Sequence, residues 1–152
     1  MNEENPMPTF ARLVGAVLLA GLGVYMAMLA KPYLPEGEPA EMLLPVTAVM
    51  GIIVGWVFTG KQLERGQGRG AAIGLSSVLL LAFWTAFLFA VEEMVDRSMR
   101  GSYGGSPTHA VQDVFNILLD YTDVLQLDVI LAMFVGGVIV GVITAFVGKH
   151  TR

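Results

Sequence analysis

The segment Val129–Gly148, VILAMFVGGVIVGVITAFVG, decides the fold, because its twenty residues include no charged side chain. Three further segments share this character: Leu13–Ala30, Met42–Gly60 and Gly70–Val91. At about 1.5 Å of rise per residue, roughly twenty helical residues cross a hydrocarbon core of about 30 Å. The sequence therefore predicts an all-α polytopic membrane protein, built as a bundle of four transmembrane helices.

The four crossings form one membrane domain that covers residues 1–152. We expect transmembrane helices at about residues 10–30, 42–60, 70–92 and 127–148. Between the first two helices, Pro32 and Pro35 lack the amide donors that a helix needs. After the third, a group of helix breakers ends the crossing: Gly101, Gly104, Gly105 and Pro107.

The region between the third and fourth crossings predicts an additional helix over about residues 107–124. Ser106 is suited to cap its first turn, and Pro107 fits the first helical position. Apolar side chains then recur at steps of three and four residues, while polar ones fall elsewhere: Asp113, Asn116, Asp120 and Asp123. The pattern indicates an amphipathic helix outside the bilayer. Because its polar face is acidic, two interpretations stay open: a lid on the bundle, or a surface for a ligand or partner.

The composition supports a membrane protein and excludes thiol chemistry. Hydrophobic residues make up 55% of the chain and charged residues 14%, so a soluble domain of this length would lack polar surface. The expected partner of the excess apolar surface is the lipid bilayer. The chain contains no cysteine, which excludes disulfides, thiolate metal sites and redox catalysis through a thiol.

The distribution of basic residues predicts the orientation of the bundle. An even number of crossings places both termini on one side of the membrane. That side carries six basic residues: Arg12, Lys61, Arg65, Arg69, Lys149 and Arg152. The opposite side carries three: Lys31, Arg97 and Arg100. We therefore expect the N and C termini to be cytoplasmic and the acidic opposite side to face outward.

Small residues recur at four-residue spacing inside the crossings. Three glycine pairs lead this pattern: Gly51 with Gly55, Gly70 with Gly74, and Gly137 with Gly141. Such spacing lets helix backbones approach closely in lipid, where apolar side chains alone drive little association. The glycines are therefore helix-packing candidates. They indicate either packing within one chain or the formation of a homo-oligomer.

The membrane segments lack the side chains that ion-coupled carriers use. No Asp, Glu, Lys, Arg or His interrupts the four apolar runs, whereas a carrier or proton relay usually needs such a group at membrane depth. Hydroxyl side chains inside the runs mostly bond back to their own helix, and we single out five of them: Thr47, Ser76, Ser77, Thr85 and Thr144. We give these hydroxyls a substrate role only if they converge on a hydrated cavity.

Catalytic and metal-binding patterns are also missing from the sequence. His109 and His150 are predicted on opposite sides of the membrane, so they cannot share a metal or a haem. An acidic cluster at the end of the third crossing indicates a solvated helix end with Arg97 and Arg100 as counter-charges: Glu92, Glu93 and Asp96. Phosphate loops, nucleophilic triads and basic patches for nucleic acid are not found. We expect no enzymatic activity, cofactor, metal or nucleic-acid partner.

Four stretches, taken in order, resemble the TrgA family of small bacterial membrane proteins. They are Met7-Pro8-Thr9, the loop Lys31–Gly37, the segment Gly51–Gly60 and the segment Ala110–Tyr121. The likeness covers nearly the whole chain after Met7. The motif residues that carry it best are the Leu-Pro-Glu-Gly turn and the tryptophan of the Gly-Trp pair: Leu34, Pro35, Glu36, Gly37 and Trp56.

The resemblance implies a phenotype, and it leaves the mechanism open. TrgA proteins are associated with tellurite resistance in alphaproteobacteria, which implies a location in the bacterial inner membrane. The function we expect is an indirect contribution to tellurite or oxidative-stress tolerance, because an uncharged interior suits an oxyanion pore poorly. Two alternatives stay open: an accessory or scaffold subunit of a larger membrane complex, and a small channel or carrier. The partner would be a second copy of the chain or another membrane protein.

Overall fold

The computed structural model describes residues 8–34, 40–64, 69–101 and 104–150. Within these ranges the chain is helical and contains no strand. The helices are α1 (Pro8–Ala30), α2 (Ala40–Val54), α3 (Lys61–Glu64), α4 (Gly70–Met99), α5 (Pro107–Asp120) and α6 (Leu127–His150). Three shorter turns of other helix types extend them: 3-10 turns η1 (Lys31–Tyr33) and η3 (Tyr121–Val124), and a π-helix η2 (Gly55–Gly60) between α2 and α3.

Four helical segments are long and apolar enough to cross a membrane: Phe10–Tyr33, Ala40–Gly60, Gly70–Met99 and Leu127–His150. Only about a third of the most apolar stretch of each is buried inside the chain. Large apolar side chains cover much of the remaining surface, including Tyr25, Ile52, Phe83 and Phe134. Such a surface is stable in lipid and would aggregate in water. The predicted all-α fold with four apolar spans is confirmed.

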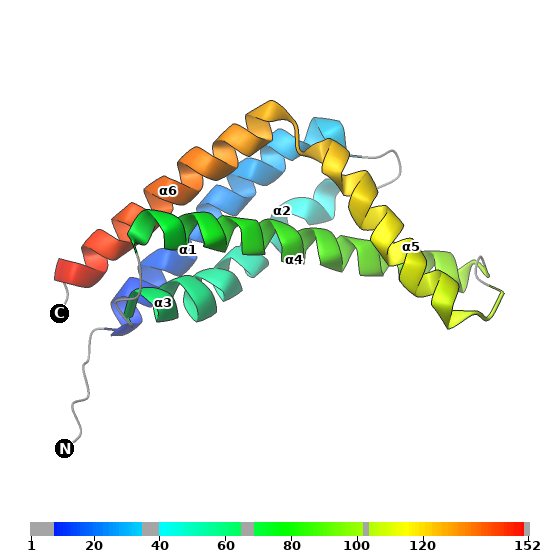
Figure 1. The fold of residues 1–152 in the computed structure, drawn as a ribbon, viewed down its shortest axis with the longest axis horizontal. Helices are drawn as coiled ribbons and strands as arrows, with labels where there is room; N and C mark the ends of the chain where they lie inside the picture. The colour runs from blue at the N-terminus through cyan, green and yellow to red at the C-terminus, as the bar shows by residue number, and fades with distance from the viewer. Residues whose placement is uncertain (1–7, 35–39, 65–68, 102–103, 151–152) are drawn as a thin grey trace, which may run out of the picture.

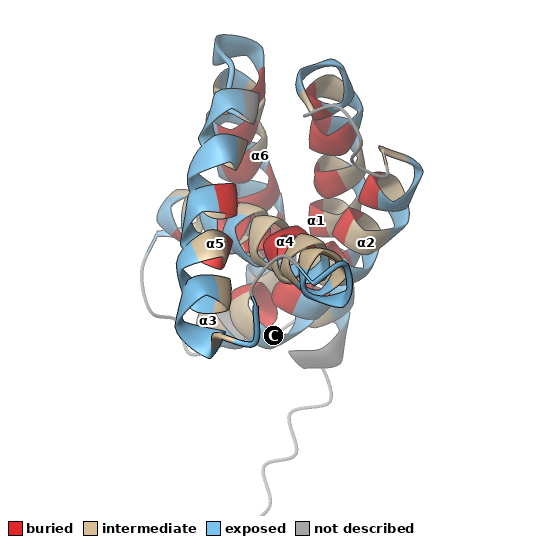
Figure 2. Cartoon of the chain, turned by 90° about the vertical axis from the view of Figure 1, so that its right-hand side faces the viewer, coloured by how far each residue is buried: buried red, intermediate tan, exposed pale blue. Residues whose placement is uncertain are grey.

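The spans are arranged as three neighbouring helices crossed by a fourth (Figure 1). Helix α1 runs beside α2 and also contacts α6, while α4 crosses these helices obliquely and extends past them. Helix α5 then connects the far end of α4 with the start of α6. The buried residues lie on the faces that these helices turn toward one another (Figure 2). The core centres on Leu19 of α1 and on Val78 and Leu81 of α4.

Two helix boundaries differ from the sequence-based expectation for physical reasons. Helix α4 ends at Met99, beyond the expected residue 92, because side-chain ion pairs at four-residue spacing support its polar final turns. Helix α2 begins at Ala40, before the expected residue 42, so Pro45 lies inside the helix. The proline removes one amide donor near the helix end, where water can replace it.

The connection from α4 to α5 depends on glycine. Gly101, Gly104 and Gly105 have φ angles of 76°, 54° and 82°. Residues with a side chain rarely adopt this left-handed backbone region, so the turn requires glycine. The helix break that the sequence predicts after the third crossing lies at this turn. The turn reverses the chain and lets α5 return along the last turns of α4.

Candidate functional site

The bundle has two ends that differ in packing. We call the end that holds Gly70 and His150 the terminal end, and the end that holds α5 the α5 end. At the terminal half, α4 and α6 meet through glycine. A Cβ atom on Gly74 would lie 2.6 Å from the Cα atom of Gly141 and would also overlap the carbonyl oxygen of Gly137. A Cβ on Gly70 would lie 2.7 Å from the carbonyl oxygen of Gly141. Here the two backbones touch.

A second glycine contact joins α1 to α2. A Cβ atom on Gly51 would lie 2.6 Å from the Cα atom of Ala20, and one on Gly55 would lie 2.5 Å from the Cα atom of Ala16. The six packing candidates of the sequence thus lie at contacts between helices of this chain. Close approach of this kind favours dispersion and weak Cα–H···O interactions in lipid.

The buried hydroxyls of the spans bond mostly within the protein. Thr47, Ser77 and Thr144 each donate to the backbone carbonyl four residues earlier, at 2.6, 2.7 and 2.7 Å. Ser77 also lies 2.6 Å from the Oγ1 atom of Thr59, and because the Ser77 proton is already used, Thr59 is the donor. Ser76 is exposed on the lipid side of α4. Of the five hydroxyl residues that the sequence singled out, Thr47 and Thr85 line a common cavity, and its remaining lining is almost entirely apolar, whereas Ser76, Ser77 and Thr144 lie outside it.

A cavity of about 130 Å³ lies at the α5 half of the bundle. All four spans contribute to its wall, and η3 with the residue after it closes one side. The lining is apolar, with Met26 from α1, Leu43 from α2, Phe89 from α4 and Met133 from α6 among its members. The cavity forms where α4 leaves the other spans, so that α4 no longer fills the space between them.

Thr85 of α4 is the exception among the buried hydroxyls. Its side chain lines the cavity and is 8% exposed, and its Oγ1 atom has no hydrogen-bond partner. Tyr121 of η3 contributes a second hydroxyl-bearing side chain to the same wall. Sequence reasoning grouped Thr85 with the other hydroxyls and missed this difference, because the helix divergence that opens the cavity has no local signal in the sequence.

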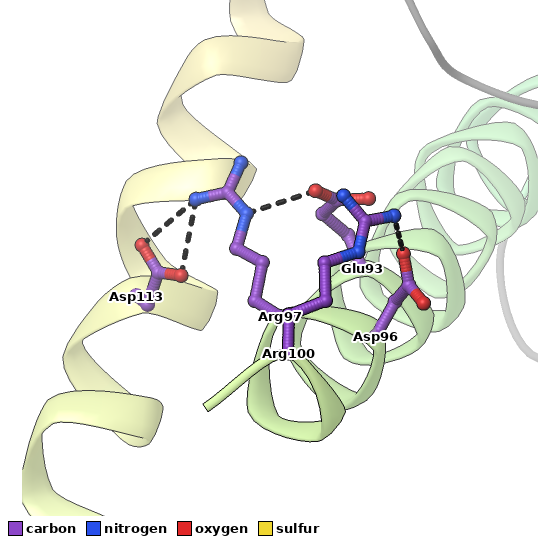
Figure 3. Close-up of polar contacts among 5 residues, drawn as sticks. All are labelled: Glu93, Asp96, Arg97, Arg100 and Asp113. Atoms are coloured by element: carbon purple, nitrogen blue, oxygen red, sulfur yellow. Dashed lines mark hydrogen bonds and ion pairs between the residues drawn. The ribbon is translucent and has the colours of Figure 1, made fainter. Parts of the chain in front are cut away.

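Polar contacts at the α5 end hold α5 against α4 (Figure 3). The guanidinium of Arg97 donates from Nε to Glu93 at 2.8 Å and from Nη1 to Asp113 of α5 at 3.1 Å. Arg100 pairs with Asp96 of its own helix. The interpretation of this region as a helix end with basic counter-charges is confirmed. The link from Arg97 to α5 was not foreseen, because it joins residues from separate helices.

The amphipathic pattern of α5 divides into a buried and an exposed part. Val114 and Ile117 are buried and pack with Ala90 of α4. A neighbouring apolar stripe is exposed, formed by Val111, Phe115 and Leu119. We call these three residues the α5 stripe. One face of the helix thus packs against α4, and another presents apolar side chains outward.

The remaining sequence candidates are spread over the molecule. Leu34 lines the cavity, and Trp56 is exposed in the π-helix η2. The motif residues Pro35, Glu36 and Gly37 lie outside the described residues. His109 lies on α5 and His150 at the end of α6, at distant parts of the fold (Figure 1).

The fold and its apolar surface define the class: a helical membrane protein that has, in the part of the chain the structure describes, four apolar spans and the amphipathic helix α5 between the third and the fourth. Comparisons with protein-family models, with curated proteins and with solved structures return no match.

Proposed function

We propose that this chain is a non-enzymatic, TrgA-like protein of the bacterial inner membrane that contributes indirectly to tolerance of tellurite or oxidative stress. The observation that supports an indirect role is the direct backbone contact at the terminal half. Between α4 and α6, Gly74 and Gly141 leave no space for a solvated path. An oxyanion would also need cationic or donor groups along its route, and the apolar runs hold no charge.

An accessory role in a larger membrane complex is the second candidate, and the α5 stripe favours it. The side chains of Val111, Phe115 and Leu119 are 58%, 63% and 65% exposed. They follow one another at four-residue steps, so they share one face of the helix. Because Arg97 and the buried residues of α5 fix the helix to α4, this face is presented at a defined position.

The proposed tolerance role is tested by deleting the gene and measuring survival on tellurite together with intracellular tellurium. We expect lower survival at unchanged tellurium content, because an indirect role does not alter uptake or export. The wild-type gene and the Gly21→Ala variant should both restore survival, since a Cβ at Gly21 meets no atom within 4 Å. Higher tellurium in the deletion strain would support a carrier instead, and unchanged survival would reject a role in tolerance.

The accessory role is tested with a matched pair of truncations. Phe115 lies in the α5 stripe and Phe134 on the surface of span α6, with 63% and 50% exposure. Each tagged variant, Phe115→Ala and Phe134→Ala, is purified in mild detergent from its native host. We expect a stoichiometric partner to be lost with Phe115→Ala and retained with Phe134→Ala. Equal recovery of the partner with both variants would exclude the α5 stripe as its docking surface.

A further inference from the structure

We propose that the cavity at the α5 half is a binding site for a small, neutral, apolar molecule that carries one hydrogen-bond-accepting oxygen. The hydroxyl of Thr85 would donate to that oxygen, and the apolar wall would enclose the remainder of the molecule. Three observations support this site: the size of the cavity, the buried and unpartnered hydroxyl of Thr85 in its wall, and the depth of Thr85 along α4.

The size of the cavity fits one ring or a short chain. Its volume is about 130 Å³. An engineered apolar cavity of about 150 Å³ in another protein stays dry and binds benzene. The lining side chains Met26, Phe89 and Met133 offer the same kind of surface. A molecule that fills such a space regains the dispersion contacts that an empty wall lacks.

The state of Thr85 indicates what the molecule must carry. Thr47, Ser77 and Thr144 satisfy their hydroxyl protons at the carbonyl four residues earlier, whereas the Oγ1 atom of Thr85 is buried without a partner. An unpaired hydroxyl in an apolar site is costly, and a bound acceptor removes that cost. Thr85 thus distinguishes a ligand with an oxygen from one without.

The depth of Thr85 excludes a charged ligand group at this position. Thr85 precedes Glu92 by seven residues on α4, which corresponds to about 10 Å of helix. The oxygen would therefore lie well below the charged rim of α4. No charged residue lines the cavity among the residues that the structure describes. An ion or a lipid headgroup would lose its hydration there without compensation.

The test uses two planar probes that differ by one group: acetophenone, with a carbonyl oxygen, and α-methylstyrene, with a methylene in its place. Methyl NMR of the full chain with ¹³C-labelled methionine reports binding in detergent. Met26 and Met133 line the cavity, while Met28 is exposed on the same helix as Met26 and reports partition into the detergent. We expect saturable shifts at Met26 and Met133 with both probes, and no saturable shift at Met28.

Two isosteric substitutions isolate the hydroxyl. The ratio of acetophenone to α-methylstyrene affinity should fall about fivefold in Thr85→Val, the effect of one neutral hydrogen bond. The same ratio should be unchanged in Thr144→Val, because Thr144 is buried, bonds to Val140 and does not line the cavity. Ala86→Leu, which fills the cavity, should abolish both sets of shifts. An unchanged ratio in Thr85→Val, or shifts at Met26 that follow those at Met28, would overturn the proposal.

Discussion

Gly74 lies where α4 has no room for any side chain. A Cβ atom would come within 2.6 Å of the backbone of α6 at Gly141, so an alanine must push two helices apart. We predict that Gly74→Ala lowers the free energy of unfolding by about 1–3 kcal/mol, the range for overpacking a close contact. The measurement is equilibrium unfolding in a mixed detergent system.

Gly21 provides the matched control for this substitution. It is also helical, but a Cβ at this position meets no atom within 4 Å. Gly21→Ala should leave stability unchanged or raise it, because alanine restricts the unfolded chain more than glycine does. Equal effects of the two substitutions would mean that the contact between α4 and α6 contributes nothing to stability.

The hydroxyls of Thr85 and Thr59 differ in how much they contribute to the stability of the protein without a ligand. Thr59 donates to Ser77 across two spans at 2.6 Å, while the hydroxyl of Thr85 has no partner. We predict that Thr59→Val costs about 0.6 kcal/mol of stability, a typical value for a hydrogen bond between membrane helices. Thr85→Val should cost nothing or stabilise the protein. Thermal unfolding without added ligand checks both, and a larger loss for Thr85→Val would contradict the assignment of its hydroxyl.

At the scale of the helices, Arg97 is the side chain that couples α4 to α5. It contacts Asp113 on the neighbouring helix, whereas Arg100 pairs only with Asp96 among the contacts described. We predict that Arg97→Gln raises the hydrogen-exchange rates of the Val114 and Ile117 amides by about two- to fivefold. The modest size follows from the 40% exposure of the Arg97 side chain, which lets solvent weaken the pair.

Arg100→Gln is the control, because it removes the same charge from the same helix end. It should leave exchange in α5 unchanged. The double variant Arg97→Asp with Asp113→Arg restores opposite charges and should recover part of the protection. If both single variants accelerate exchange equally, the positive charge at the end of α4 in general holds α5 in place, and the specific contact between Arg97 and Asp113 does not.

The sequence predicts the positions of the helices along the chain better than it predicts how the helices pack against one another. The four spans follow from apolar length, a local property that any packing must respect. The last turns of α4 and their contact with α5 depend on Arg97 meeting Asp113, which lies on another helix. The cavity is harder still to predict, because it depends on the direction in which α4 leaves α1 and α6. Thr85 has the same residue type as Thr144 and differs only in what surrounds it.

At the scale of the whole molecule, the fold has one close-packed half and one half with a cavity. Direct backbone contact fixes the terminal half, where glycines of α4 and α6 meet. At the other half α4 diverges, and Tyr121 of η3 with Leu125 covers part of the space that opens. The close packing of the terminal half thus holds the four spans together while the α5 half contains a cavity. The division also places the cavity and the α5 stripe on the same half, where η3, which follows α5 directly, contributes Tyr121 to the cavity wall.

The distribution of charge predicts the orientation of the molecule, and single introduced cysteines can test it because the chain has no cysteine of its own. Thr108 of α5 and Lys149 of α6 are both exposed and lie at opposite ends of the bundle. We predict that a membrane-impermeant maleimide labels Thr108→Cys in intact spheroplasts and labels Lys149→Cys only after lysis. The reason is the excess of basic residues on the side of the termini, six against three, which retains that side in the cytoplasm. Labelling in the reverse pattern would show the opposite orientation, with the α5 stripe on the cytoplasmic side. Labelling of both cysteines in intact cells would contradict the arrangement of four spans.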